Sequence, residues 1–495
     1  MRSRSARLVW LLAVAGFLGC SDFSDTQAPE MEAAESGPSL DNNPLLGGGG
    51  SADNATMGAW SAPFPWVNVG VHLSLLPSGK VLSFGRLNGG TPQVWDPATG
   101  SFTPFASPSL LFCAGSTFLS NGGLLVAGGH ILDGLGLPNT NIFNFNNNTW
   151  TVKQPMALGR WYPTITTLAN GDAVALGGTD QNGSTVLIPE VYQAASGTWR
   201  RLTSASAWLP YYPRTFLAPN GRIFYAGEMQ GTSYLNTAGT GSWTFVANRV
   251  VGGRDYGSAV MYQPGKILYM GGGDPPTATA EVIDLNVASP QWRLTNPMSV
   301  PRRQISATLL PDGKVAVTGG TSSSGFTNLG SPQRHVEVWD PATETWTVWA
   351  SAAVPRGYHN TTVLLPDGRL LHTGSGDGAG LPNEINAEVF SPPYLFQGPR
   401  PVITSAPATL RYGQSVVIGT PSPAGVGFAT LVRLSSNTHS FDMGQHFGRM
   451  QVTRGGTSVT VKIPASANRM PPGPYMLFLI GTNGVPSVAK MVRVF

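Results

Sequence analysis

The chain repeats one short pattern seven times, and this repeat restricts the folds that the chain can adopt. Each copy is an apolar, strand-like segment that follows one glycine and ends at a second glycine six residues later. The pairs are Gly79/Gly85, Gly122/Gly128, Gly171/Gly177, Gly221/Gly227, Gly265/Gly271, Gly313/Gly319 and Gly368/Gly374. Regular recurrence of one unit indicates stacked or radial repeats, since a single unit cannot bury its own apolar faces.

A second mark lies between the glycine pairs, where an aromatic residue and an aspartate precede a turn and a tryptophan. It is clear in Val338-Trp339-Asp340-Pro341-Ala342-Thr343-Glu344-Thr345-Trp346. The repeat aromatics are Phe102, Trp150, Trp199, Trp243, Trp292 and Trp346. Their spacing of about 44 to 54 residues, with short strands and many Gly and Pro residues, predicts four-stranded blades of a kelch-type β-propeller.

The seventh copy has no tryptophan after it, whereas Trp60 precedes the first copy. An open ring would leave unpaired strand edges. We therefore expect the segment around Trp60 to supply the outer strand of the last blade and to close a ring of seven.

The chain divides into four parts. Residues 1–19 are basic and then apolar, which predicts a signal peptide. Residues 20–57 read as a flexible linker that begins with Cys20, in a setting that resembles a lipoprotein cleavage box. Residues 58–398 hold the repeats, and residues 399–495 show alternating strands that predict an immunoglobulin-like β-sandwich. The predicted fold class is all-β, and the predicted location is secreted or in the cell envelope, with Cys20 as a lipid tether.

The charge of the chain argues against a nucleic-acid partner. The formal net charge is +4, but Arg2, Arg4 and Arg7 lie in the predicted signal peptide, which leaves about +1 for the rest. The chain has two cysteines. If Cys20 is lipidated or removed, Cys113 has no disulfide partner, which is unusual in an oxidising compartment.

Position-matching across the repeats predicts a ring of residues at the axis. The residue nine positions before the first glycine of each pair is, in order, Gly70, Cys113, Tyr162, Tyr212, Tyr256, Gln304 and His359. If the copies are blades around one axis, Cys113, Tyr162 and His359 lie near one another. Tyr358 precedes the last ring position, and His439 lies in a polar segment that interrupts the apolar strands of the smaller domain.

Two histidine nitrogens and two tyrosine oxygens suit Cu(II) better than zinc or calcium. The sequence has no cysteine pair at zinc spacing and no Asp-rich calcium loop. A lone histidine in a β-protein is usually a satisfied polar residue, and a free cysteine is usually a small buried hydrophobe. The combination of these residues at one predicted axis is what favours a metal site.

Four motifs resemble those of the copper radical oxidases, the galactose oxidase and glyoxal oxidase family. They are Phe112-Cys113-Ala114-Gly115, Arg160-Trp161-Tyr162-Pro163, Arg356-Gly357-Tyr358-His359 and Thr438-His439-Ser440-Phe441-Asp442-Met443-Gly444-Gln445. The resemblance covers roughly residues 60–495, and the Arg-Trp-Tyr-Pro motif is closer to glyoxal oxidase.

The resemblance implies a role for each residue. Tyr162 would bind one copper ion, be joined to Cys113 by a thioether bond and carry a stable radical. His359 and His439 would be the nitrogen ligands. Tyr358 would be the axial ligand and would accept the proton of the substrate. The hairpin that carries His439 would reach into the propeller axis.

The resemblance also implies the reaction, in which a small-molecule substrate reduces O2 to H2O2. In galactose oxidase a tryptophan from a later loop stacks on the crosslinked tyrosine, but the corresponding loop here, Thr179-Asp180-Gln181-Asn182, has none. Trp161 is the candidate replacement. We expect an enzyme that resembles glyoxal oxidase, acts as a monomer and oxidises small aldehydes, as hydrates, or primary alcohols.

Two alternatives remain open. One is a primary-alcohol or carbohydrate oxidase of the galactose oxidase type. The other is a non-catalytic kelch propeller that binds surface polysaccharide or protein. A non-catalytic propeller would have no need for Tyr358, His359 and His439 together.

Overall fold

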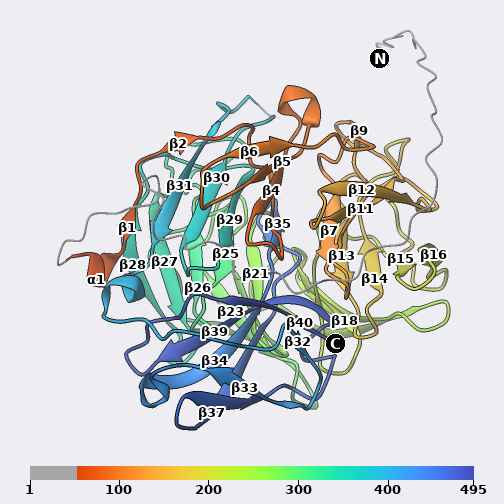
Figure 1. Ribbon diagram of the computed structural model, residues 1–495. Helices are drawn as coiled ribbons and strands as arrows, with labels where there is room; N and C mark the ends of the chain where they lie inside the picture. The colour runs from red at the N-terminus through yellow and green to blue at the C-terminus, as the bar shows by residue number, and fades with distance from the viewer. Residues whose placement is uncertain (1–52, 379) are drawn as a thin grey trace, which may run out of the picture.

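The structure is a computed structural model that describes residues 53–378 and 380–495 (Figure 1). The predicted signal peptide, Cys20 and most of the predicted linker lie outside these residues. The described chain is almost entirely β-structure, and its one α-helix is the single turn α1 (Asn54–Met57). Short 3-10 turns cover Leu87–Gly90, Pro393–Phe396 and Pro423–Gly425. Among the described residues, no helix has the length and apolar character needed to cross a membrane.

Seven antiparallel blades form the larger domain, as predicted; blades 1 to 6 have four strands each, and the outer strand of blade 7 consists of two short pieces. Blade 1 comprises β3 (His72–Leu75), β4 (Val81–Phe84), β5 (Gln93–Trp95) and β6 (Phe102–Pro104). Blade 2 comprises β7 (Gly115–Phe118), β8 (Leu124–Ala127), β11 (Thr140–Asn144) and β12 (Thr149–Lys153), and a small hairpin of β9 (His130–Leu132) and β10 (Leu135–Gly136) is inserted in it. Blade 3 comprises β13 (Thr164–Thr167), β14 (Ala173–Leu176), β15 (Glu190–Gln193) and β16 (Thr198–Arg201).

The next three blades repeat this arrangement. Blade 4 comprises β17 (Arg214–Leu217), β18 (Ile223–Gly227), β19 (Gly231–Asn236) and β20 (Ser242–Asn248). Blade 5 comprises β21 (Ser258–Gln263), β22 (Lys266–Met270), β23 (Ala280–Asp284) and β24 (Trp292–Thr295). Blade 6 comprises β25 (Ser306–Leu309), β26 (Val315–Thr318), β27 (His335–Asp340) and β28 (Thr345–Ser351).

Blade 7 is closed by the amino-terminal end of the propeller. It comprises β29 (Asn360–Leu364), β30 (Leu370–Gly374) and β31 (Asn386–Ser391), together with β1 (Ala59–Trp60) and β2 (Phe64–Pro65). Trp60 pairs with Phe390 of β31, and its indole N–H donates to the carbonyl of Ala350 in blade 6 at 2.9 Å. The predicted closure by the segment around Trp60 is therefore confirmed.

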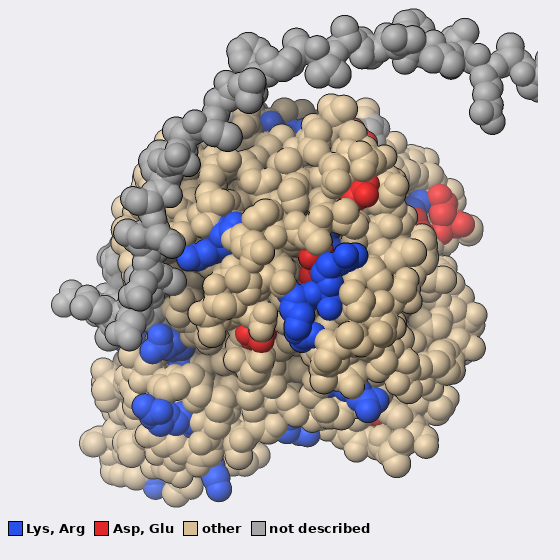
Figure 2. All heavy atoms as spheres, turned by 90° about the vertical axis from the view of Figure 1, so that its right-hand side faces the viewer, with Lys and Arg blue, Asp and Glu red and all other residues tan. Residues whose placement is uncertain are grey.

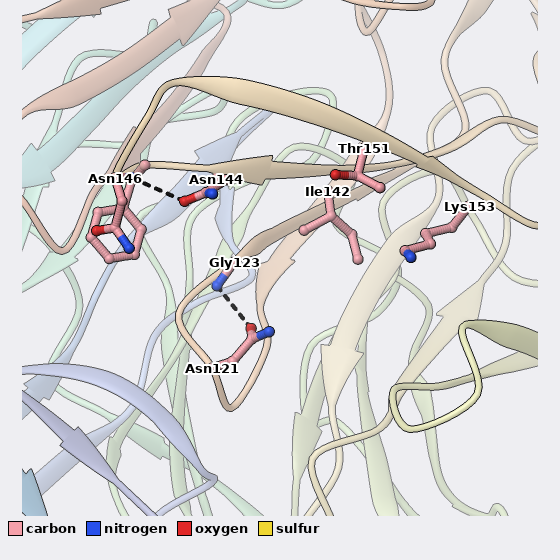
Figure 3. Close-up of a pocket in the computed structure, with 8 residues that line it drawn as sticks. Asn121, Gly123, Ile142, Asn144, Asn146, Thr151 and Lys153 are labelled. Atoms are coloured by element: carbon pink, nitrogen blue, oxygen red, sulfur yellow. Dashed lines mark hydrogen bonds between the residues drawn. The ribbon is translucent and has the colours of Figure 1, made fainter. Parts of the chain in front are cut away.

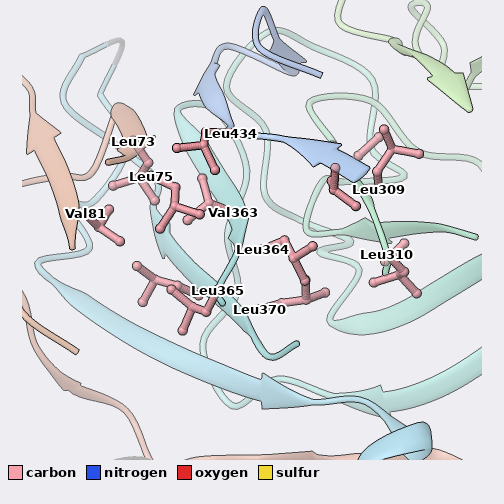
Figure 4. Packing of buried hydrophobic residues seen from close by; sticks show 14 of the residues in the cluster. Leu73, Leu75, Val81, Leu309, Leu310, Val363, Leu364, Leu365, Leu370 and Leu434 are labelled. Atoms are coloured by element: carbon pink, nitrogen blue, oxygen red, sulfur yellow. The ribbon is translucent and has the colours of Figure 1, made fainter. Parts of the chain in front are cut away.

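The glycine pairs flank the second strand of every blade. The first glycine of each pair has a φ between 80° and 93°, a left-handed conformation that suits glycine in the tight turn from the first strand to the second. The first and second strands are buried on both faces, as in β3 and β4, whereas the outer strand β12 is largely solvent-accessible. The apolar core therefore lies between neighbouring blades, where Leu75, Val363 and Leu309 of three blades belong to one cluster (Figure 4).

The smaller domain is a β-sandwich. Its strands are β32 (Thr409–Leu410), β33 (Ser415–Gly419), β34 (Val426–Arg433), β37 (Phe447–Arg454), β38 (Ser458–Lys462), β39 (Gly473–Gly481) and β40 (Lys490–Val494). The first part of β37 pairs with β34 and its last part pairs with β38, so one strand joins the two layers. This agrees with the predicted immunoglobulin-like sandwich.

One hairpin of the smaller domain leaves the sandwich and enters the propeller. It consists of β35 (Ser436–Thr438) and β36 (Phe441–Asp442), and β35 pairs with β3, the innermost strand of blade 1. Figure 1 shows β35 among the inner strands of the blades.

Charged side chains are scattered over the face in Figure 2, and most of that face is uncharged.

Candidate metal centre

The predicted axial ring is present, and its backbone has an unusual conformation. Cys113, Tyr162, Tyr212, Tyr256, Gln304 and His359 all have positive φ, between 45° and 70°. Such φ values are costly for residues with a side chain and persist only where the surrounding structure imposes them. The repeat places a strained, left-handed residue at the same point of six blades.

Backbone hydrogen bonds link some ring positions directly to the next blade. The amide of Tyr162 donates to the carbonyl of Cys113, and the amide of Tyr212 donates to the carbonyl of Tyr162, both at 2.9 Å. Gln304 donates to the carbonyl of Tyr256 in the same way, also at 2.9 Å. These bonds bring the side chains of neighbouring blades together, as the repeat predicted.

Buried Arg–Glu pairs hold the loops that lead into the ring. In blade 3, Glu190 accepts hydrogen bonds from the guanidinium of Arg160 at 3.0 Å and from the amide of Ala157 at 2.8 Å. Equivalent pairs are Arg254–Glu281, Arg302–Glu337 and Arg356–Glu388. Each glutamate lies on the third strand of its blade, so a rigid strand fixes the segment that precedes the ring residue.

His439 lies at the tip of the hairpin that enters the axis. Thr438 pairs with Phe441, so His439 and Ser440 form a two-residue turn, and both have positive φ. Hydrogen bonds fasten the hairpin to several blades: Asn437 donates to Ser306 in blade 6, and Ser258 in blade 5 donates to the carbonyl of Ser440. The smaller domain therefore supplies a side chain at the centre of the larger one, as expected.

The four predicted ligand residues lie together. The ring centroid of His439 is 4.4 Å from those of Tyr162 and His359 and 5.7 Å from that of Tyr358. The hydroxyls of Tyr162 and Tyr358 are hydrogen-bonded to each other. All four side chains are buried. Two imidazoles and two phenols from blades 3 and 7 and from the hairpin thus share one volume.

The hydrogen bonds of His359 and His439 show which nitrogen of each imidazole ring is available to bind a metal ion. The Nδ1–H of His359 donates to the carbonyl of Gly376 at 2.5 Å. The hydroxyl of Thr438 donates to the carbonyl of Val71, so it accepts from the Nδ1–H of His439, at 2.6 Å. The Nε2 atoms of both histidines are buried and have no hydrogen-bond partner among the described residues. Two buried lone pairs without partners fit a metal ion, since ligating histidines usually donate their other ring N–H.

Burial controls the protonation of the cluster. It lowers the pKa of His359 to about 3, and it lowers the pKa of His439 well below its usual value, an effect to which the nearby His359 adds. Both imidazoles are therefore neutral, which is the form that binds metals. Burial also raises the pKa values of Tyr162 and Tyr358 above the ordinary tyrosine value. Without a cation nearby, both phenols keep their protons.

Among the described residues, no group of three or more His, Cys, Asp and Glu side chains is arranged to hold a metal ion. The candidate ligand set contains only two such side chains, His359 and His439, because its other two members, Tyr162 and Tyr358, are tyrosines. A mixed set of imidazole nitrogens and phenol oxygens is typical of copper rather than of structural zinc or calcium.

Cys113 lies beside Tyr162. It is a free, buried cysteine, and it belongs to the same apolar cluster as Tyr162 and Tyr212. Burial raises the pKa of the Cys113 thiol well above its ordinary value, and a hydrogen bond with the Tyr162 side chain opposes part of that rise. Its backbone amide donates to Nε2 of His72 at 3.1 Å. Cys113 and Tyr162 are thus close neighbours, as position-matching across the repeats predicted.

Trp161 stacks on Tyr162. The two ring centroids are 3.7 Å apart and the planes are inclined by 12°. The indole N–H of Trp161 donates to Nδ1 of His130 at 3.2 Å, which fixes the orientation of the ring. The sequence offered Trp161 only as a candidate for this position, and the structure places it there.

A cavity of about 310 Å³ opens beside the cluster. Tyr162 and His439 line its inner end, and ring residues Tyr212 and Tyr256 also line it. Gln304 does not line it and instead donates to the carbonyl of Phe326. The sequence did not identify Trp208 and Tyr211, which lie in the connection between blades 3 and 4 and form part of the wall. The dense aromatic run Trp208-Leu209-Pro210-Tyr211-Tyr212 is the signal that could have identified them.

Other hollows in the molecule are small or unrelated to the cluster. A depression on blade 2 between Asn121, Ile142 and Lys153 encloses only about 10 Å³ (Figure 3). His446 hydrogen-bonds through Nε2 to the carbonyl of Arg469 and is not part of the cluster. The cavity at the axis reaches two of the candidate metal ligands, Tyr162 and His439.

Comparisons with known proteins agree with the geometry. Residues 400–494 match the family model described as Galactose oxidase-like, Early set domain. A galactose oxidase of Gibberella zeae is 28% identical, over 90% of this chain and 72% of its own length. The aldehyde oxidase GLOX of Vitis pseudoreticulata is 27% identical, over 81% of this chain and 85% of its own length.

A solved structure gives the same result. A fungal alcohol oxidase of the AA5 family, in complex with copper, superposes with a TM-score of 0.80 and 25% identity, over 89% of this chain and 100% of its own. The fold is therefore that of a copper-containing alcohol oxidase. More particularly, the chain is a relative of the galactose oxidases and the GLOX aldehyde oxidases. Its identities to these two kinds of relative are nearly equal and do not separate them.

Proposed function

We propose that this chain is a copper radical oxidase that oxidises primary alcohols, or small aldehydes as their hydrates, and reduces O2 to H2O2. Its relatives are named as oxidases, and the similar alcohol oxidase structure is in complex with copper, which supports the oxidase activity. The observation that carries the assignment of the site is the pair of buried Nε2 atoms without partners beside two phenols. In this proposal His359, His439, Tyr162 and Tyr358 hold one copper ion.

The overall reaction removes two hydrogens from the substrate, one from a C–H bond and one from an O–H bond, and transfers both to O2. A copper ion bound here would supply a redox partner and a positive charge that favours phenolate over phenol. The residues that would accept the two hydrogens from the substrate are Tyr358 and Tyr162, whose hydroxyls are hydrogen-bonded to each other.

Tyr358 is the proposed acceptor of the hydroxyl proton. Its ring packs against His359, with centroids 3.7 Å apart, and against Phe326 at 4.7 Å. These contacts hold the phenol in one orientation, which is what a positioned base requires. Tyr162 is the proposed acceptor of the hydrogen atom and the carrier of the radical, in a thioether bond with Cys113. Trp161 and Tyr212 pack against its ring.

We propose further that the protein is exported, as a secreted or cell-envelope protein with Cys20 as a lipid tether, and acts as a monomer. The basic and apolar start of the sequence supports export. Growth with labelled palmitate, followed by detection of label in the wild type and in Cys20→Ala, tests the tether.

Peroxide release after copper loading tests the oxidase proposal. The wild type is expected to release peroxide with at least one of methylglyoxal, benzyl alcohol or galactose. His439→Ala is expected to release none, whereas His446→Ala, which removes a histidine outside the cluster, is expected to retain activity. Full copper binding with no peroxide from any of these substrates would favour the alternative of a non-catalytic propeller that binds polysaccharide or protein.

A further inference from the structure

The cavity at the axis has two walls of different chemistry. One wall is the connection between blades 3 and 4, and it contributes Trp208, Leu209, Pro210 and Tyr211. The other wall contributes Arg214, Glu228, Asp255 and Tyr256. The volume of about 310 Å³ is at the lower end of the range for small-molecule sites, and it exceeds what a two-carbon aldehyde fills.

The first wall continues the aromatic stack on Tyr162 towards solvent. Tyr211 packs edge-on against both rings of that stack, 5.0 Å from Trp161 and 5.3 Å from Tyr162. Trp208 lies farther out and is 56% exposed, and Tyr211 is 41% exposed. Within the described chain, Trp208 has no aromatic or hydrogen-bonding partner. Trp208 and Tyr211 together place exposed apolar surface at the mouth of the cavity, and contiguous patches of this kind mark ligand-binding grooves.

The polar side chains of the second wall are already paired within the protein. The guanidinium of Arg214 donates to the carbonyls of Tyr212 and Gly257 and lies 3.3 Å from Glu228. Glu228 also accepts from the amide of Tyr256 at 3.1 Å. Asp255 is paired with Arg303. Few hydrogen-bonding groups remain free to recognise the many hydroxyls of a sugar, and the charges on this wall largely balance.

We propose that this cavity binds the ring of an aryl primary alcohol or an aryl aldehyde, with Trp208 and Tyr211 as the residues that determine specificity. The inference rests on the proposed oxidase function and names its substrate class. A planar, apolar ring stacks on an aromatic wall without needing hydrogen-bond partners. The reacting carbon, one bond from the ring, would then lie at the inner end, next to Tyr162 and His439. For such a substrate the reaction is ArCH2OH + O2 → ArCHO + H2O2.

The test is a binding measurement on the full chain without added copper, with benzyl alcohol as the probe in a ligand-observed NMR titration. Trp208→Ala is expected to weaken binding about tenfold, because one aromatic stack is worth up to about 1.5 kcal/mol. The matched control is Phe245→Ala, which removes an aromatic residue that is 62% exposed on β20 and does not line the cavity. The control is expected to bind as the wild type does. D-galactose is expected to bind more weakly than benzyl alcohol to all three proteins.

The inference is overturned if the wild type does not bind benzyl alcohol, if Trp208→Ala and Phe245→Ala bind it equally, or if galactose binds as tightly as benzyl alcohol. Copper loading separates this inference from the proposed function. If benzyl alcohol binds and Trp208→Ala weakens it, but the loaded protein releases no peroxide from it, the binding site stands and the oxidase proposal fails. If the loaded protein oxidises methylglyoxal and ignores benzyl alcohol, the oxidase proposal stands and the aryl specificity fails.

Discussion

Trp161 lies flat on Tyr162, its immediate neighbour in the chain, with ring centroids 3.7 Å apart. Consecutive residues of a strand normally point to opposite faces. The positive φ of Tyr162, 64°, reverses the chain locally and brings the two rings onto the same side. The indole N–H bond to His130 then holds Trp161 in place.

We expect this stack to stabilise the oxidised form of Tyr162. Trp161→Leu should shorten the lifetime of the oxidised, coloured form of the copper-loaded protein about fivefold, since an aromatic stack is worth about 1 kcal/mol and ~1.36 kcal/mol is a factor of ten in rate. Trp161→Phe should retain most of the lifetime. The decay of visible absorption measures it. Trp243→Leu, on the outer strand of blade 4, is the matched control, and an equal loss in that variant would show that the effect is not specific to the stack.

The histidines of the cluster should be required for metal binding. Copper in hundredfold excess over its Kd should stabilise the wild type by about 2.7 kcal/mol, which appears as a rise in Tm. His359→Ala and His439→Ala should abolish this rise, because each removes a buried nitrogen without a partner. His446→Ala should keep it, although loss of its bond to Arg469 lowers the starting Tm. A copper-induced rise that persists in both cluster variants would place the metal elsewhere.

The sequence predicted more of the fold than of the candidate metal site. The seven glycine pairs were sufficient for the blade number, and Trp60 for the closure, because both follow from a repeat that each blade must satisfy. Position-matching also grouped Cys113, Tyr162 and His359. Position-matching could not predict how side chains are oriented, because the orientation of Trp161, for example, depends on the reversal of the backbone at Tyr162. The wall formed by Trp208 and Tyr211 was not predicted, because it lies in a connection outside the repeat.

The buried Arg–Glu pairs should contribute strongly to stability. Glu190→Gln leaves the fully buried Arg160 without a countercharge, and removal of one partner of a buried pair costs about 3 kcal/mol or more. Urea unfolding should show this loss. Glu281→Gln, in the equivalent pair of blade 5, is the matched variant and should be destabilised to a similar extent. Only Glu190→Gln should also weaken copper binding, since Glu190 holds the loop that leads to Tyr162. Equal copper affinity in the two variants would contradict that positioning role.

Asp442 should make stability depend on pH. Burial raises its pKa to about 6, and its Oδ2 has no hydrogen-bond partner among the described residues. The folded protein therefore favours the protonated carboxyl. That contribution is fully present below about pH 4, the unfolded pKa, and is lost as the pH rises through 6, by about 3 kcal/mol in total. Asp442→Asn, which stays neutral, should lack this loss, so urea midpoints of the two proteins should diverge from pH 4 to pH 7. Parallel midpoints would contradict it.

The proposed radical oxidase depends most on the thioether bond that we propose between Cys113 and Tyr162. Peptide mapping by mass spectrometry, after exposure of the protein to copper and oxygen, tests it directly. The account predicts that the peptides carrying Cys113 and Tyr162 travel as one species, two hydrogens lighter than their sum, and that Cys113→Ser yields separate peptides. A free Cys113 thiol in fully copper-loaded protein would contradict the radical mechanism at its centre.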